Sequence, residues 1–267
     1  MAMPRHILED TYGARGQAPM RFLAPAAVAT LLGSRGYKGE PSVAVVESGN
    51  HRVTLLSPSG HHQRTIPCAA TSGSRAAARQ ERGVLACGSG APLAWTGSMR
   101  YPMGVASDAD GHSIIVADTH QHRLLRLRVS DGALLANQST WQPSFGHFAQ
   151  PLRYPKGLAH HVQRWGASRF PILFVADAGN HRVQTYALAP AHPAGAILTG
   201  LPGLTPTAAD AKLVPLVSFG QPCGDPSHVD PASCMRGPSA VAAVELADGT
   251  RPRGLHASST DCILIAC

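Results

Sequence analysis

The 267-residue chain lacks any long hydrophobic run. A membrane-spanning helix needs about 20 predominantly apolar residues, and no stretch approaches that length. The first residues hold Arg5, Glu9 and Asp10 without an apolar segment, so they do not resemble a secretory signal. The more apolar stretch 20–33 contains Pro25 and suits a first strand better. The sequence therefore predicts no membrane span and favours an intracellular location.

Known catalytic and metal-binding signatures are also missing. There is no glycine-rich phosphate loop, nucleophile elbow or His-Glu-x-x-His helix. Fourteen histidines group only at 61–62, at 160–161 and at His120 with His122. Adjacent histidines on a strand point to opposite faces, so only His120 and His122 could share one. We interpret the histidines as turn and surface residues and predict no cofactor, metal site or catalytic residue.

The six cysteines include no Cys-x-x-Cys pair, so a zinc finger is not indicated. None lies in the core of a clear repeat, and they fall two by two at Cys68 and Cys87, Cys223 and Cys234, and Cys262 and Cys267. Pairing within each set would staple loops, as in oxidising compartments. Because no secretion signal supports that reading, free thiols are favoured.

Acidic residues are fewer than basic ones, 16 against 23, and the net charge is +7. The basic residues are mostly arginines, scattered rather than striped. The densest group is Arg123, Arg126 and Arg128, of which the last two share a strand face and predict a solvated surface. RNA recognition would also want exposed aromatic rings for stacking, whereas the 14 aromatic residues mostly occupy core or turn-flanking positions. Nucleic-acid binding stays open but is not favoured.

What the chain does have is an internal repeat, which fixes architecture before local propensity is weighed. The stretches 46–53, 117–124 and 176–183 share an acid, a turn and an arginine five positions after the acid. Strands rich in β-branched and aliphatic residues flank each turn. The Gly-Asn pairs at 49–50 and 179–180 tolerate the positive φ that such a turn needs.

The acid and the arginine straddle the turn, so we predict a cross-hairpin ion pair in each repeat. A fold needs the same triplet once per repeat and catalysis seldom does, which makes these turns structural. The residues assigned to this role are Glu47, Asn50, His51, Arg52, Asp118, His122, Arg123, Asp177, Asn180, His181 and Arg182.

Each repeat is preceded by an apolar entry strand that opens with proline, as Pro-x-Gly at Pro102 and Pro155. With the Val-Ala-Asp strand end and the Asn-His-Arg-Val turn, these motifs resemble the NHL repeat, which builds β-propeller blades. Ser-Phe-Gly at 144–146 and 218–220 is similar to the outer-strand ending of such blades. The first unit departs from the pattern, with Glu47 as its acid. The resemblance implies an all-β propeller of NHL type.

A fourth copy of the repeat is cut short. Pro238 resembles another entry without its glycine, and 263–266 aligns with the second strand of the earlier units, which leaves Cys267 in the place of the acid. A blade that stops there leaves a bare sheet edge, which natural folds usually cover. Three explanations stay open: a fragment, an incomplete gene model, or half of a circle closed by another chain.

The entry prolines 25, 102, 155 and 238 are 77, 53 and 83 residues apart, whereas a compact blade takes about 40–50. We therefore expect loop insertions over 61–91 and 187–212, with delayed fourth strands at 93–95 and 213–217. The predicted organisation is a tail over 1–19 and a propeller over 20–267, with about four blades at 20–100, 101–148, 149–220 and, incomplete, 237–267.

The leading functional hypothesis is a non-enzymatic binding scaffold that presents its rim loops to a protein partner. Fold-level analogy carries much of it, and a fold does not determine a function. The resemblance leaves two alternatives. One is a hydrolase or lyase, of the lactone or peptidyl-hydroxyglycine type, with a metal in the central channel; the other is a propeller that binds RNA on a basic face.

Overall fold

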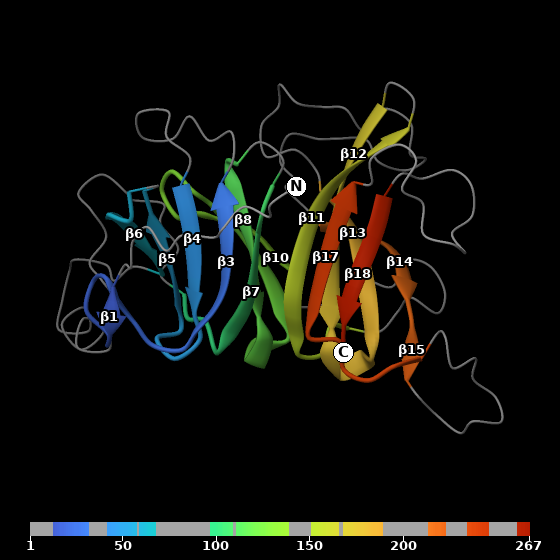
Figure 1. Ribbon diagram of the computed structural model, residues 1–267, viewed down its shortest axis with the longest axis horizontal. Helices are drawn as coiled ribbons and strands as arrows, with labels where there is room; N and C mark the ends of the chain where they lie inside the picture. Colours follow the sequence, from blue (N-terminus) through green and yellow to red (C-terminus); the bar gives the residue numbers. More distant parts are fainter. Residues whose placement is uncertain are drawn as a thin grey trace, which may run out of the picture.

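The structure is a computed structural model, shown in Figure 1. It describes residues 13–31, 42–57, 59–67, 97–108, 111–138, 151–165, 168–188, 213–222, 234–245 and 261–267. In this part of the chain the only helices are two short 3-10 turns, η1 (Thr119–Gln121) and η3 (Ala178–Asn180), and the other regular elements are strands. Neither helix is long and apolar enough to cross a bilayer.

Three antiparallel sheets of four strands follow one another along the chain, each in simple up-and-down order. Blade 1 consists of β3 (Pro25–Leu31), β4 (Ser42–Glu47), β5 (Arg52–Leu56) and β6 (His62–Ile66). Blade 2 consists of β7 (Pro102–Ser107), β8 (Ser113–Asp118), β9 (Arg123–Arg128) and β10 (Leu134–Gln138). Blade 3 consists of β11 (Pro155–Trp165), β12 (Ser168–Asp177), β13 (Arg182–Leu188) and β14 (Leu213–Phe219).

A fourth sheet has two described strands, β17 (Ala240–Glu245) and β18 (Asp261–Ala266), which pair antiparallel from Ala240 opposite Ala266 to Glu245 opposite Asp261. The alignment of the chain's last residues with a second blade strand is therefore confirmed. The first strands of successive sheets pack side by side, β3 with β7, β7 with β11 and β11 with β17 (Figure 1). The chain is thus an all-β protein of consecutive propeller blades, three with four described strands and one with two.

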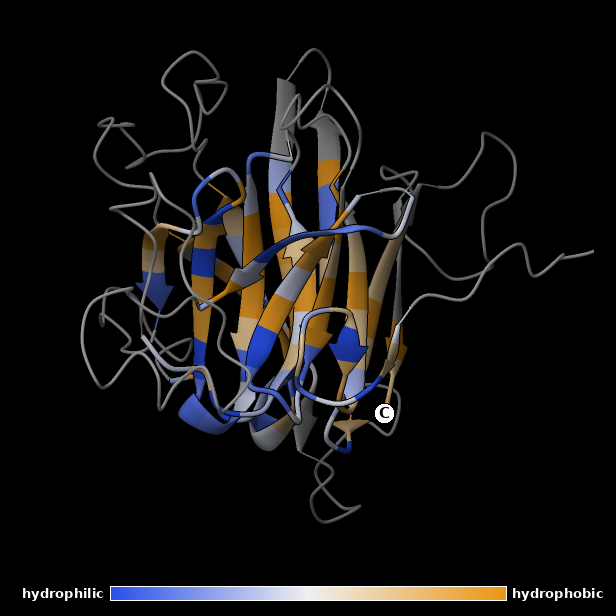
Figure 2. Ribbon diagram, turned by 90° about the vertical axis from the view of Figure 1, so that its left-hand side faces the viewer, coloured by the Kyte–Doolittle hydropathy of each residue, from blue (hydrophilic) through white to orange (hydrophobic). Residues whose placement is uncertain are grey.

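The hydrophobic core lies between the sheets, and both faces of the central strands β5, β8 and β13 are buried. In β8, Ile114 and Val116 pack toward blade 1, whereas the alternate residues Ile115 and Ala117 pack toward blade 3. A third apolar cluster, which includes Val183 and Val241, joins blade 3 to the fourth sheet. Figure 2 shows the apolar residues along the middle of the strands.

Two glycines explain how closely the first strands of neighbouring blades approach. A methyl group at Gly104 would lie 1.9 Å from the carbonyl oxygen of Lys156, and one at Gly157 would lie 2.6 Å from the Cα of Ala240. Since real side-chain atoms do not come so near, the glycine of the Pro-x-Gly entry makes room for the next blade. Glycine is needed at this position because the two backbones approach closely.

The predicted fourth strand of blade 3 is confirmed, because β14 covers 213–217 and ends at Phe219 in the Ser-Phe-Gly motif. Blade 1 differs from expectation. Its outer strand is β6, inside the expected insertion 61–91, where Thr65 and Ile66 are buried against β5. The residues before them are polar, and only one end of the strand is buried, so the hydrophobic pattern of the sequence does not reveal it. The proposed strand at 93–95 and the motif at 144–146 lie outside the described residues, and the outer strand of blade 2 is β10.

Residues 14–22 form a short strap before blade 1. The strap begins inside the predicted tail and ends after it. Its strands β1 (Ala14–Arg15) and β2 (Arg21–Phe22) pair in parallel. The Arg52 guanidinium donates hydrogen bonds to the carbonyl oxygens of Gln17 and Arg21, at 2.7 and 2.8 Å. The strap is thereby fastened to the first repeat turn.

Candidate functional site

The three repeat turns lie at one end of the blades, the lower end in Figure 1 where the short coil η3 is drawn. We call this end the turn rim and define it by residues 47–52, 118–123 and 177–182 together with the blade entries at 100–101, 153–154 and 236–237. Each turn joins the second and third strands of its blade, and each entry leads into a first strand. The rim brings all of the predicted repeat-turn residues together.

The expected ion pairs are present in all three turns. The arginine Nε lies 2.8 Å from a carboxylate oxygen in Glu47–Arg52, Asp118–Arg123 and Asp177–Arg182. The three carboxylates are fully buried, with 0% exposure. A buried carboxylate requires such partners, because its desolvation is otherwise costly.

The acids also anchor the entry of their own blade. The backbone N–H of Arg100 donates to Asp118 Oδ1, and that of Arg153 donates to Asp177 Oδ1, both at 2.7 Å. Glu47 instead accepts the Thr54 hydroxyl at 2.5 Å. Burial raises the pKa of Asp118 above its usual value, although the Arg100 N–H and the Arg123 guanidinium act against this shift.

The asparagine of the turn holds the acid and the entry segment at once. Asn180 Nδ2 donates to Asp177 Oδ2 and to the carbonyl oxygen of Pro151, each at 2.8 Å. Asn50 does the same with Glu47 Oε2 and the carbonyl oxygen of Gly16. Gln121, which replaces asparagine in the second turn, donates to the Ser98 carbonyl at 2.8 Å, so the contact to the entry segment is kept.

The histidine of each turn is bonded to the next blade. The Nδ1 atoms of His51, His122 and His181 accept backbone N–H groups of Tyr101, Tyr154 and Gly237 respectively, at 3.1, 3.0 and 3.0 Å. In the neutral ring the proton then sits on Nε2. Burial lowers the pKa of His51, and the nearby Arg100 lowers it further. We call these three contacts the histidine latches.

A second bond crosses two of the same seams. The Ser48 hydroxyl donates to the Pro102 carbonyl at 2.5 Å, and the Thr119 hydroxyl donates to the Pro155 carbonyl at 2.7 Å. Ala178 occupies this position in the third turn and has no hydroxyl. The latch is therefore the turn contact that recurs at every seam, and the hydroxyl contact is not.

The turns correct one expectation about backbone conformation. Positive φ falls on the histidines, with 55° at His51, 54° at His122 and 56° at His181, rather than on the Gly-Asn pairs. Gly179 serves a different purpose, because a methyl group there would lie 2.8 Å from the Arg153 carbonyl oxygen. The glycine allows close approach of the entry segment, and the histidine takes the left-handed conformation at the end of the turn, where its N–H bonds to the carbonyl three residues earlier.

The exposed surface of the rim carries a row of aromatic and imidazole rings. Tyr101 contacts the rings of His51 and His120, with centroids 4.6 and 4.7 Å apart, and Tyr154 contacts His122 at 4.4 Å and His120 at 5.8 Å. The two tyrosines remain 45% and 41% exposed. His120 and His122, the only local pair that could share a strand face, both contact the ring of Tyr154. Among the described residues, no group of three or more histidines, cysteines or acids could hold a metal ion.

An exposed arginine stands beside each of these entries, and sequence reasoning missed the series. Arg100, Arg153 and Arg236 occupy the position two residues before the entry proline of three consecutive blades, and all three are exposed. The signal was visible as Arg-Tyr-Pro, Arg-Tyr-Pro and Arg-Gly-Pro. The arginines are scattered along the chain, and the series becomes visible only when they are aligned by their place in the repeat.

Arg126 corrects another expectation, since it lies in the protein interior and not on a solvated strand face. It is 1% exposed, and its guanidinium lies 3.2 Å from Asp108 Oδ2 and 2.8 Å from Ser113 Oγ. Ser113 in turn donates to Asp108. Arg128 behaves as expected and makes a partly exposed ion pair with Asp131. Period two placed both arginines on one face without showing that blade 3 covers only part of it.

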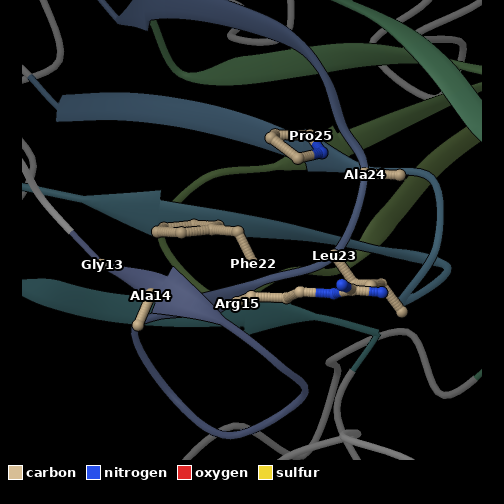
Figure 3. Close-up of a pocket in the computed structure, with 7 residues that line it drawn as sticks. All are labelled: Gly13, Ala14, Arg15, Phe22, Leu23, Ala24 and Pro25. Atoms are coloured by element: carbon tan, nitrogen blue, oxygen red, sulfur yellow. The ribbon is translucent and has the colours of Figure 1, made fainter.

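The expectation of free thiols is wrong for Cys234, which is disulfide-bonded, and holds for Cys267, which is free and exposed. The strap adds an open pocket of about 530 Å³, lined by residues 13–15 and 22–25 (Figure 3). The labelled side chains are mostly apolar, with Phe22 and Leu23 the largest and Arg15 the one charged group.

No protein-family model and no curated protein matches the chain. Solved structures that resemble it include Kuenenia stuttgartiensis hydrazine synthase, with a TM-score of 0.41, 10% identity and coverage of 89% of this chain and 42% of that chain. The β-propeller domain of Myceliophteria thermophila Cps50 (Swd1) has a TM-score of 0.38 and 11% identity, and the match covers 68% of this chain and 43% of that chain. A catalytically inactive Staphylococcus aureus virginiamycin B lyase with quinupristin has a TM-score of 0.33 and 14% identity, and the match covers 60% of this chain and 37% of that chain.

The chain spans about two fifths of the length of these solved chains. At such identities and TM-scores the matches carry no information about activity or partner.

Proposed function

We propose that the chain is a binding scaffold, built of NHL-type blades, that holds a protein partner on its turn rim. The observation that carries this proposal is the pair of exposed tyrosines, Tyr101 and Tyr154, on backbone that the repeat turns hold in place. Protein interfaces are enriched in tyrosine, arginine and methionine. Arg100 precedes the first tyrosine in the rim, and the 37% exposed Met103 follows just beyond it on β7.

The rim is also prepared for binding before any partner arrives. The N–H groups of Tyr101 and Tyr154 are held by the latches, and their rings pack against imidazoles. A surface ordered in advance loses less conformational freedom on association, which favours affinity.

Contacts in the structure support the proposed NHL type in addition to the sequence. Acid, asparagine or glutamine, histidine and arginine make equivalent bonds in three consecutive blades: the acid to the arginine, the amide to the entry segment, and the histidine to the next blade. A motif that sets the seam between blades explains why the same residue types recur once per blade. The repeat-turn residues are accordingly proposed to be structural, with binding assigned to the entries that they hold.

The proposal is tested with the double substitution of Tyr101→Ala and Tyr154→Ala. Alanine is acceptable at this backbone position, because Ala24 takes it at the entry of blade 1 with φ of 48°. We expect wild-type protein, purified from its native source under gentle conditions, to retain a partner that the double variant loses. The matched control is Phe219→Ala, an exposed aromatic on the outer strand of blade 3 that is 44% exposed.

Equal thermal melting of the three proteins shows that the fold is intact. Retention of the same partner by the double variant contradicts the proposal. So does turnover of a lactone or of a peptidyl-hydroxyglycine by metal-loaded protein that runs alone, since that result favours the hydrolase or lyase.

A further inference from the structure

We infer that the turn rim binds an extended, carboxylate-rich peptide segment of its partner, across blades 2, 3 and 4. This inference rests on the proposed function and names the chemistry of the partner. It starts from Arg100, Arg153 and Arg236, which recur once per blade at the exposed entries. We call these three residues the arginine row.

The arginine row has no carboxylate to neutralise it within the described residues. Every acid of the repeat turns is fully buried and bonded to an arginine of its own turn, so no turn contributes negative charge to the surface. The row itself takes part in no ion pair in the described part of the chain. Its guanidinium groups therefore favour a ligand that brings its own negative charge.

Backbone hydrogen bonds fix where two of the three arginine side chains start. The Arg100 carbonyl accepts the His120 N–H at 3.1 Å, and its own N–H is held by Asp118. The Arg153 carbonyl accepts the Gly179 N–H at 2.7 Å, and its N–H is held by Asp177. The aliphatic stem of Arg153 also crosses Gly179, because a methyl group there would lie 2.6 Å from Arg153 Cγ. A fixed origin for each side chain sets the spacing of the charges that can be recognised.

The rings of the turn rim add hydrogen-bond donors to the same surface. His51 and His122 use Nδ1 as acceptors for the latches, which leaves Nε2 as the N–H donor in the neutral rings. The phenol groups of Tyr101 and Tyr154 can donate as well. A surface of guanidinium, imidazole N–H and phenol groups fits a ligand rich in acceptors.

The arrangement favours a peptide carboxylate over a nucleic acid or a phosphate group. Base stacking needs an open aromatic face, and each tyrosine already contacts two imidazoles. Phosphate groups on peptides are typically bound by clustered arginines, whereas this row offers one per blade with a ring beside it. Single carboxylates along an extended chain match single guanidiniums.

The test is fluorescence anisotropy of the full chain with a short fluorescein-labelled peptide of alternating Glu and Ala. The comparison peptides have Gln, Lys or phosphoserine in place of Glu, and an oligouridine RNA is a further probe. We expect binding of the Glu peptide, weakened as salt rises, and none of the Gln or Lys peptides. Arg100→Gln and Arg153→Gln should each weaken it about threefold, and together about tenfold.

The matched control is Arg128→Gln, which removes the same charge at the opposite end of β9, where Arg128 is 42% exposed. It should leave the affinity within about twofold. Equal binding of Glu and Gln peptides, or arginine-row variants that bind like the control, overturns the inference. Tighter binding of the phosphopeptide or of RNA, lost in the same variants, also overturns it.

The two proposals fail in different ways. If the tyrosine variant loses a partner but the Glu peptide does not bind, the scaffold function stands and the carboxylate assignment falls. If neither effect is seen, both fall.

Discussion

At the scale of the residue, the latch made by His51 contributes to the response of the protein to acid. A latch needs an unprotonated Nδ1, so protonation of the ring removes the acceptor of the next blade's N–H. For His51 the folded protein already resists protonation, because burial and Arg100 lower its pKa below the ordinary 6.5. His62 is shifted in the same direction, mainly by burial.

We predict that stability falls as the pH drops below about 6.5. A base whose pKa is lowered by folding binds fewer protons in the folded than in the unfolded state, so acid favours unfolding. The contribution of His51 is fully present above pH 6.5, its unfolded value, and is lost as pH falls through the lower folded value. The measurement is urea denaturation of wild type and His51→Asn between pH 5 and 8, the range in which histidine titrates.

Asparagine tolerates the left-handed backbone and does not titrate. The variant should therefore show a shallower loss of stability in acid, while His62, whose pKa is also lowered, continues to contribute. Parallel pH curves for the two proteins would contradict the role given to His51.

At the scale of the element, the entry strands show how one missing side chain governs the packing of two blades. Gly157 faces the Cα of Ala240 on β17, and the approach leaves no room for a methyl group. The same position in blade 1 is held by Ala27, so the constraint belongs to particular seams and not to the motif as such.

We predict that Gly157→Ala destabilises the protein by about 1–3 kcal/mol, as overpacking typically does. The matched control is Ala27→Gly at the equivalent position, which should cost no more than about 1 kcal/mol from added chain entropy. Chemical denaturation measures both. A Gly157→Ala protein as stable as wild type would mean that β11 and β17 can move apart without loss.

The elements also show what sequence could and could not predict. The ion pairs and the pairing of β18 followed from the repeat, because residue types that recur at fixed spacing report local geometry directly. Strand β6 was hidden, since only Thr65 and Ile66 are buried and a two-residue signal does not stand out from loop sequence. The positive φ of the histidines belongs to the end of each turn, and the burial of Arg126 depends on Asp108 and Ser113, and the hydrophobic pattern describes neither.

At the scale of the whole molecule, the apolar clusters lie between consecutive sheets and do not merge into one centre. One cluster joins blades 1 and 2, another joins blades 2 and 3, and the last joins blade 3 to β17 and β18. A blade is thus stabilised by its immediate neighbours, as in other repeat architectures.

We predict that Val183→Ala, in the last of these clusters, loosens the protein locally. Removing buried methyl groups should cost about 1–3 kcal/mol, and hydrogen exchange should rise in β12, β13 and β17. Exchange in β4 and β5 of blade 1 should remain close to wild type, because no cluster links them directly to Val183. Hydrogen exchange with mass spectrometry checks this, and a uniform rise across all blades would show that the sheets open as one unit.

The latch has one more consequence, for how the surface can change over evolution. Each histidine accepts a hydrogen bond from a main-chain N–H. The side chain of the residue that supplies this N–H therefore takes no part in the latch. The chain already uses this freedom, with Tyr101 and Tyr154 at two seams and Gly237 at the third. Substitution at these positions can therefore change which partner the surface recognises, one residue per blade, while the hydrogen bonds between the blades are kept.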